Sequence, residues 1–104
     1  MARKVVWTYE ASADLEELAK YIARDSVFYA AAFVQEIRDA SHSLNELSER
    51  GRIVPELRNY NFRELFVREY RLIYNIEETC IVVIALIHGK RDLRRLWEKE
   101  ERGN

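Results

Sequence analysis

The sequence has few of the residues that build disulfides, metal clusters and glycine-rich loops. Its 104 residues include one cysteine, one proline, three glycines and two histidines. Cys80 cannot form an internal disulfide and has no CxxC partner for zinc, so we expect a small buried hydrophobe there. No GxxxxGK[ST], GxGxxG or HExxH motif occurs, and we therefore expect no cofactor and no metal site.

Long apolar runs are also missing. No window approaches the 18 or so apolar residues of a membrane span, and the start "MARKVVWTYE" has too short an apolar stretch for a secretion signal. We therefore expect a cytoplasmic protein that does not bind membranes. The 48% of hydrophobic residues favours a compact fold, and the length suits one domain, residues 1–104, around one core.

What the sequence does contain is an uneven distribution of charge. Residues 50–71 and 88–104 hold 12 of the 17 basic residues and 7 of the 18 acidic ones, which gives these segments a net charge of +5. The remainder has 5 basic and 11 acidic residues, a net charge of −6. The protein is therefore expected to be a dipole with an arginine-rich end, which suggests nucleic acid as a partner.

The spacing of apolar residues predicts two helices near the start of the chain. Residues 3–8 are typical of a strand, and a stripe with helical period follows from about Ala11 to Arg24. A second stripe begins after the capping residues Asp25 and Ser26 and continues to near Gly51. Because the connection is so short, the helices should form an antiparallel hairpin.

The apolar period then changes from 3.6 to 2. Residues 51–61 are typical of a loop, whereas residues 62–67, 70–76 and 79–88 predict an antiparallel meander. The last strand is apolar on both faces, so we place it at the centre beside the first strand. The sequence predicts an α+β domain of order β-α-α-β-β-β, a helical hairpin on a small, mostly antiparallel sheet, followed by a brief helix or an extended tail.

Arg71 and His88 carry the clearest potential chemistry. Arg71 lies between strand tyrosines, where it either binds phosphate on a concave face near Arg63 or is an ordinary solvent-facing arginine. His88 ends the central strand, where its imidazole either exchanges protons or is structural. Together with Arg91, these side chains would supply a base, an acid and cations for metal-free cleavage at a ribose 2′-hydroxyl.

Basic residues follow His88 at once. The residues we expect to contact nucleic acid or another target are Arg63, Lys90, Arg94, Arg95 and Trp97. An indole stacks on a base but cannot exchange a proton.

The stretches "ADLEELAKYIARDS", "GRIVPEL", "RELFVREYRLIYNI" and "IALIHGKRDLRRL", in this order and spacing, resemble the RelE/ParE superfamily of toxins from type II toxin-antitoxin modules. The similarity runs from about Val5 to Leu96. It implies a small α+β toxin that a cognate antitoxin wraps with its C-terminal segment, and operator DNA bound only through the antitoxin. An acidic antitoxin segment would suit a groove with apolar helix surface beside arginines.

Two activities follow from the resemblance. ParE-like members inhibit DNA gyrase without nuclease chemistry, whereas RelE-like members cut mRNA in the ribosomal A site; an inactive relative is a third possibility. The motifs resemble the ParE-like branch more closely. In the RelE-like interpretation Arg71 and Arg91 match the family's phosphate-binding and catalytic arginines, and His88 exchanges protons. However, "RELF" stands where that branch has two lysines, and Trp97 where it has a tyrosine.

Overall fold

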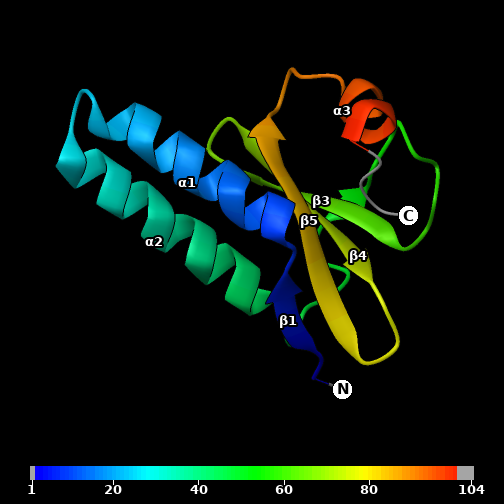
Figure 1. The fold of residues 1–104 in the computed structure, drawn as a ribbon. Coiled ribbons are helices and arrows are strands. Elements are labelled where there is room, and N and C mark those ends of the chain that lie inside the picture. The colour runs from blue at the N-terminus through cyan, green and yellow to red at the C-terminus, as the bar shows by residue number, and fades with distance from the viewer. Residues whose placement is uncertain (1, 101–104) are drawn as a thin grey trace.

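The computed structural model describes residues 2–100, with side chains up to residue 98. A five-stranded sheet of order β1-β5-β4-β3-β2 forms its centre (Figure 1). All neighbouring strands are antiparallel except β1 and β5, which are parallel. In chain order the elements are β1 (Lys4–Trp7), α1 (Tyr9–Ala23), α2 (Val27–Ser43), β2 (Arg52–Ile53), β3 (Phe62–Val67), β4 (Tyr70–Ile76), β5 (Cys80–His88) and α3 (Leu93–Glu100).

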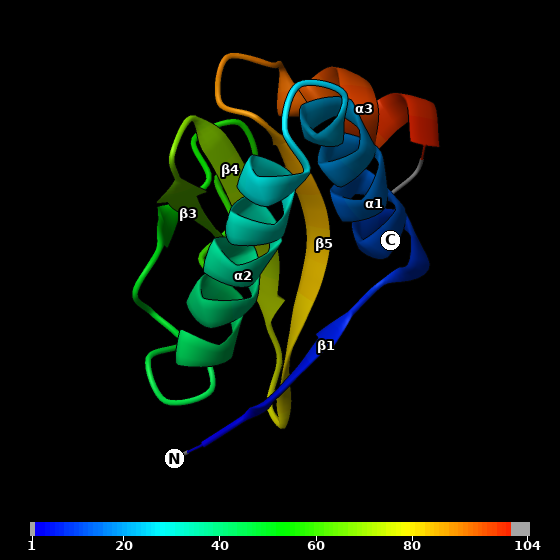
Figure 2. The ribbon, with the colours of Figure 1, turned by 90° about the vertical axis from the view of Figure 1, so that its left-hand side faces the viewer.

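The predicted α+β fold is confirmed, including the helical hairpin and the central position of the last strand. The hairpin of α1 and α2 covers one face of the sheet, as the view in Figure 2 shows. Ser26 caps α2 as expected, its Oγ accepting the N–H of Tyr29 at 3.1 Å, and Thr8 caps α1 through the N–H of Ala11 at 3.0 Å. Helix α3 packs on the opposite face through Leu93 and Leu96. Within the described part of the chain, no helix has the length and apolar character needed to cross a membrane.

Three expectations need correction. Helix α2 ends at Ser43 and not near Gly51, because Asn45 pairs with the N-terminal strand: its carbonyl accepts the N–H of Arg3 at 2.9 Å, and its Nδ2 donates to the carbonyl of Arg3 at 2.7 Å. Part of the expected loop, Arg52–Ile53, forms β2 at the edge of the sheet. Cys80 is only partly buried.

A β-bulge interrupts the pairing of β4 with β5. Ile73 lies opposite Ala85, but its neighbour Tyr74 lies opposite Val83, so Ile84 is the extra residue. Both Ile84 and Ala85 consequently belong to the core cluster on the α3 face. Beyond the bulge, every side chain of β5 points to the face opposite to the one that simple alternation predicts.

Tyr74 connects the end of the hairpin segment to the sheet. Its hydroxyl accepts the N–H of Gly51 at 2.9 Å and donates to the carbonyl of Ser48 at 2.8 Å, deep in the core. A Cβ on residue 51 would lie 2.5 Å from the carbonyl oxygen of Glu64, so only glycine fits at this crossing.

Replacing Tyr74 by phenylalanine should therefore lower the free energy of unfolding by about 1–3 kcal/mol, because it leaves the buried N–H of Gly51 and the partly buried carbonyl of Ser48 without this partner. Urea unfolding measured by circular dichroism tests this. The matched control is Tyr60→Phe, an exposed tyrosine for which a change below about 0.5 kcal/mol is expected. Equal stability of the two variants would contradict the assigned role of Tyr74.

Candidate functional site

Arg71 is buried, and its guanidinium is held by two glutamates. Nη1 and Nη2 donate to the two carboxylate oxygens of Glu56 at 2.9 and 2.8 Å, and Nε donates to Glu64 at 2.7 Å. Glu64 is also buried and accepts a second arginine, Arg52, on its other oxygen. Arg71 is only 4% exposed, so it is neither on an open phosphate-binding face nor facing solvent, and both expectations for it were wrong.

The same contacts hold α3 to the sheet. Glu56 accepts the N–H of Leu93, the first residue of α3, at 3.2 Å, and Arg71 Nη1 donates to the carbonyl of Arg91 at 3.2 Å. A carboxylate at a helix N-terminus is favoured by the helix dipole. One ion pair thus joins β4, the loop after β2 and the start of α3. We call Arg71, Glu56 and Glu64 the buried charge cluster.

The electrostatics of the cluster fix its ionisation. The hydrogen bond from Arg71 holds the pKa of Glu56 at about 2, against the opposing effect of burial. Burial works against the charge on Arg71, but the two carboxylates outweigh it, and the pKa of Arg71 is raised. Each nitrogen of the Arg71 guanidinium already binds Glu56, Glu64 or the carbonyl of Arg91. The guanidinium therefore has no free N–H group with which to bind a phosphate.

His88 lies on the other face of the sheet. The bulge turns it toward the helical hairpin, where its ring packs edge-on against Tyr70 with 5.7 Å between centroids. Its Nδ1 accepts the N–H of Lys90 at 3.2 Å, and its Nε2 lies 3.7 Å from a carboxylate oxygen of Glu69. Nδ1 therefore faces the backbone of the turn after β5, and Nε2 faces the carboxylate of Glu69.

The three residues proposed for RNA cleavage are therefore not brought together. His88 and Arg91 line a cavity of about 390 Å³ between α1 and the ends of β4 and β5, but Arg71 does not line it. No group of three or more potential metal ligands exists among the described residues.

The exposed basic residues form a separate surface. We call Lys90, Arg91, Arg94 and Arg95, on the turn after β5 and the outer side of α3, the basic edge. None of these four side chains makes an ion pair with another described residue. Trp97 is half-buried and packs edge-on against Phe62, 5.3 Å between centroids.

Arg63 does not belong to this edge. Its guanidinium donates to the carbonyls of Gly51 and Tyr60 at 3.1 and 3.0 Å, and its side chain is mostly buried. Its hydrogen bonds are those of a residue that supports the loops around β2.

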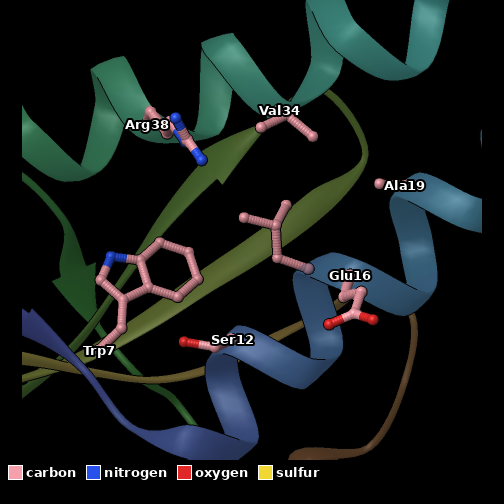
Figure 3. A pocket seen from close by; sticks show the side chains of 7 residues that line it. Trp7, Ser12, Glu16, Ala19, Val34 and Arg38 are labelled. Carbon is pink, nitrogen blue, oxygen red and sulfur yellow. The ribbon is translucent and has the colours of Figure 1, made fainter. Parts of the chain in front are cut away.

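A second cavity, of about 450 Å³, opens between α1 and α2. In Figure 3 Trp7 lies at one end of it, with Arg38 on the α2 side and Glu16 on the α1 side. Trp7 is fixed by a hydrogen bond from Nε1 to the hydroxyl of Ser41 at 2.9 Å. We call this cavity the interhelical groove; its lining is Trp7, Ser12, Leu15, Glu16, Ala19, Val34 and Arg38.

Comparison with known proteins identifies the family. Residues 5–93 match the family model described as the ParE toxin of the type II toxin-antitoxin system parDE. The chain belongs to the ParE toxin family. This family lies within the RelE/ParE superfamily that the sequence motifs resemble, and the chain is thus a type II toxin.

Individual relatives of this toxin come from both branches of the superfamily. Toxin RelE2 of Caulobacter vibrioides is 33% identical over 89 residues, which cover 85% of this chain and 97% of that protein. The chromosomal ParDE system of P. aeruginosa has a chain with a TM-score of 0.71 at 18% identity, covering 86% of this chain and 98% of that one. The RelBE2 complex of Mycobacterium tuberculosis gives 0.58 at 25% identity, covering 85% and 92%.

Removing the charge of Arg71 in this toxin should destabilise the fold. Arg71→Met leaves Glu56 without its counter-ion and leaves the buried Glu64 paired only with Arg52, which costs about 3–5 kcal/mol of unfolding free energy. Arg94→Met, on the exposed basic edge, should change it by less than about 0.5 kcal/mol. Thermal and urea unfolding of both variants checks this, and a stable Arg71→Met protein would show that the cluster is not structural.

The low pKa of Glu56 also predicts the acid behaviour of the fold. Unfolded Glu56 takes up a proton near the ordinary glutamate pKa of 4.5, whereas the pKa of the folded residue is about 2, so the unfolded state binds more protons between these values. Stability from this residue is complete above about pH 5 and is lost as the pH falls toward 2. Glu56→Gln should therefore be less stable at pH 7 and show a shallower loss between pH 5 and 2. Parallel stability curves for the two proteins would contradict this.

Proposed function

We propose that this toxin inhibits growth by binding DNA gyrase and that it does not cleave RNA. The observation that carries the proposal is the separation of the candidate nucleolytic groups. Arg71 is paired with carboxylates on the α3 face of the sheet. His88 lies on the hairpin face, where its Nδ1 accepts the N–H of Lys90, and Trp97 packs edge-on against Phe62. Ribose-assisted cleavage needs a general base within reach of a phosphate held by cations, and the candidate base, His88, lies on the opposite face of the sheet from Arg71.

The basic edge is the surface that we assign to the target. Its four cations are exposed and have no carboxylate partner among the described residues, so their field acts outward. Unpaired surface cations accelerate association with an acidic partner and set its orientation. In this proposal they contact acidic surface on gyrase or on its bound DNA.

A cognate antitoxin is the second partner in the proposal. Two solved structures similar in fold are of a ParDE system and of the toxin-antitoxin complex RelBE2. The interhelical groove combines the apolar side chains of Leu15 and Val34 with Arg38, which suits an amphipathic segment carrying an acidic residue. Operator DNA would then be contacted through the antitoxin, and the toxin would act in the cytoplasm, where gyrase and ribosomes are found.

The second candidate is a ribosome-dependent mRNA endonuclease. It is favoured by the relative named Toxin RelE2 and by the cavity that His88 shares with Arg91. In this alternative His88 and Arg91 would have to act without Arg71, on the hairpin face of the sheet.

Purified toxin added to a gyrase supercoiling assay and, separately, to translating ribosomes with primer-extension readout distinguishes the two. We expect inhibited supercoiling and intact mRNA. Arg94→Glu should weaken the inhibition about tenfold through the lost charge complementarity. The matched control is Lys4→Glu, the same charge change on the exposed start of β1, which should leave inhibition unchanged. Codon-specific mRNA cleavage with unaffected supercoiling would overturn the proposal.

A further inference from the structure

The end of the helical hairpin carries a group of exposed apolar side chains. Tyr21, Val27, Phe28 and Tyr29 are 64%, 75%, 77% and 60% exposed. They surround the connection between α1 and α2, which projects beyond the sheet in Figure 1. The rings of Phe28 and Tyr29 are in contact, with 5.9 Å between centroids. Contiguous apolar surface of this kind marks an interaction site more often than isolated exposed residues do. We call these four residues the tip patch.

A cavity of about 390 Å³ adjoins the tip patch. Tyr21 and Tyr29 form part of its wall, and Phe33 and Tyr70 from the core contribute to the lining. Its remaining lining is Ile22, Asp25, Ser26, Arg68 and Glu69. The hairpin end thus presents a protruding ring, Phe28, next to a recess with aromatic walls.

Charges of both signs accompany the patch. Arg24 and Asp25 are adjacent in the chain and exposed, and neither makes an ion pair with another described residue. The cavity's own arginine, Arg68, is already paired with Glu36 at 2.5 Å. A neighbouring cation and anion, both unpaired, are complementary to the same two charges when they are related by a two-fold axis.

We propose that the tip patch binds a second copy of this chain through a two-fold interface. Phe28 of each protomer enters the recess of the other, and Arg24 faces Asp25 of the partner subunit. A buried ring contributes roughly 150–250 Å², so the exposed fractions of the three rings and Val27 provide on the order of 500 Å² a protomer. The pair then buries about 1,000 Å², which is the lower limit for a specific interface and indicates a weak dimer.

The chemistry of the patch favours a second copy over the two partners of the proposed function. Nucleic acid needs unpaired cations, and the tip carries Arg24 together with Asp25. The interhelical groove assigned to the antitoxin shares no lining residue with the recess, so both can be occupied in one assembly.

Sedimentation velocity of the purified toxin over about 1–200 µM tests the dimer. We expect a monomer–dimer equilibrium with a dissociation constant in the range of about 10–100 µM, as for weak interfaces of this size. Phe28→Ser should weaken it at least tenfold, because the central ring is lost. Tyr60→Ser removes an equally exposed ring away from the tip and should have no effect. A monomer at every concentration, or equal effects of the two variants, would overturn the proposal.

Exchanging the charges at Arg24 and Asp25 gives a second test of the dimer, because two misfolded variants would not associate when they are mixed. In a two-fold interface Arg24→Glu and Asp25→Arg each place like charges opposite one another. Each variant alone should therefore remain monomeric at about 200 µM, above the range of dissociation constants expected for the wild type. Mixed in equal amounts, the two variants should form a heterodimer. On one side of its axis the introduced glutamate faces the introduced arginine, and on the other side the original pair of Arg24 and Asp25 is kept. Failure of the mixture to associate, while wild type dimerises, would exclude the proposed pairing.

Discussion

The buried charge cluster is the interaction on which the α3 face of this protein depends. Arg71 comes from the middle of the sheet, and Glu56 comes from the loop after β2. Since Glu56 also accepts the first N–H of α3, the helix that carries Arg94 and Arg95 is positioned by the same carboxylate. Buried ion pairs contribute little net stability compared with apolar residues, but they are costly to break, and they therefore fix one arrangement of the elements that they join.

The cluster also explains why the basic edge is basic. The arginine-rich segments contain glutamates as well as arginines, but Glu56 and Glu64 form ion pairs with Arg71 and Arg52. The arginines that remain at the surface after β5 have no such partners among the described residues. These internal pairs remove equal numbers of both signs, so they leave the net charge unchanged but raise the proportion of basic residues among the charges that remain unpaired.

The sequence predicted most of the fold and little of the site. Apolar periodicity identified both long helices and three strands, because each has one continuous buried face. It could not identify β2, two residues whose side chains are exposed and whose strand exists only by pairing with Arg63 and Glu64. The role of Arg71 could not be predicted either, because it depends on carboxylates 7 and 15 residues away. Glu64 lies in "RELF" and Glu56 in "GRIVPEL", and neither motif indicates by itself that its glutamate pairs with Arg71.

The bulge at Ile84 was beyond sequence reasoning for a different reason. Residues 81–87 are apolar on both faces, so an inserted residue leaves no mark in the hydrophobic pattern. Its effect on the site is nevertheless decisive. Without it, His88 would share the α3 face with Arg71, as the nucleolytic interpretation requires; with it, His88 packs on Tyr70 under the hairpin. A single extra residue in one strand thus places His88 and Arg71 on opposite faces of the sheet.

The separation of surfaces constrains how an antitoxin would silence this toxin. The interhelical groove lies between α1 and α2. The basic edge lies in the turn after β5 and on α3, the helix that packs on the other face of the sheet (Figures 1 and 2). A segment confined to the groove would leave the cations of the edge open to the target. Neutralisation by direct cover therefore requires an antitoxin segment long enough to continue from the groove around the sheet, with apolar residues for the first part and acidic residues for the second. This order of apolar and then acidic residues follows from the position of the apolar groove and of the basic edge on the toxin.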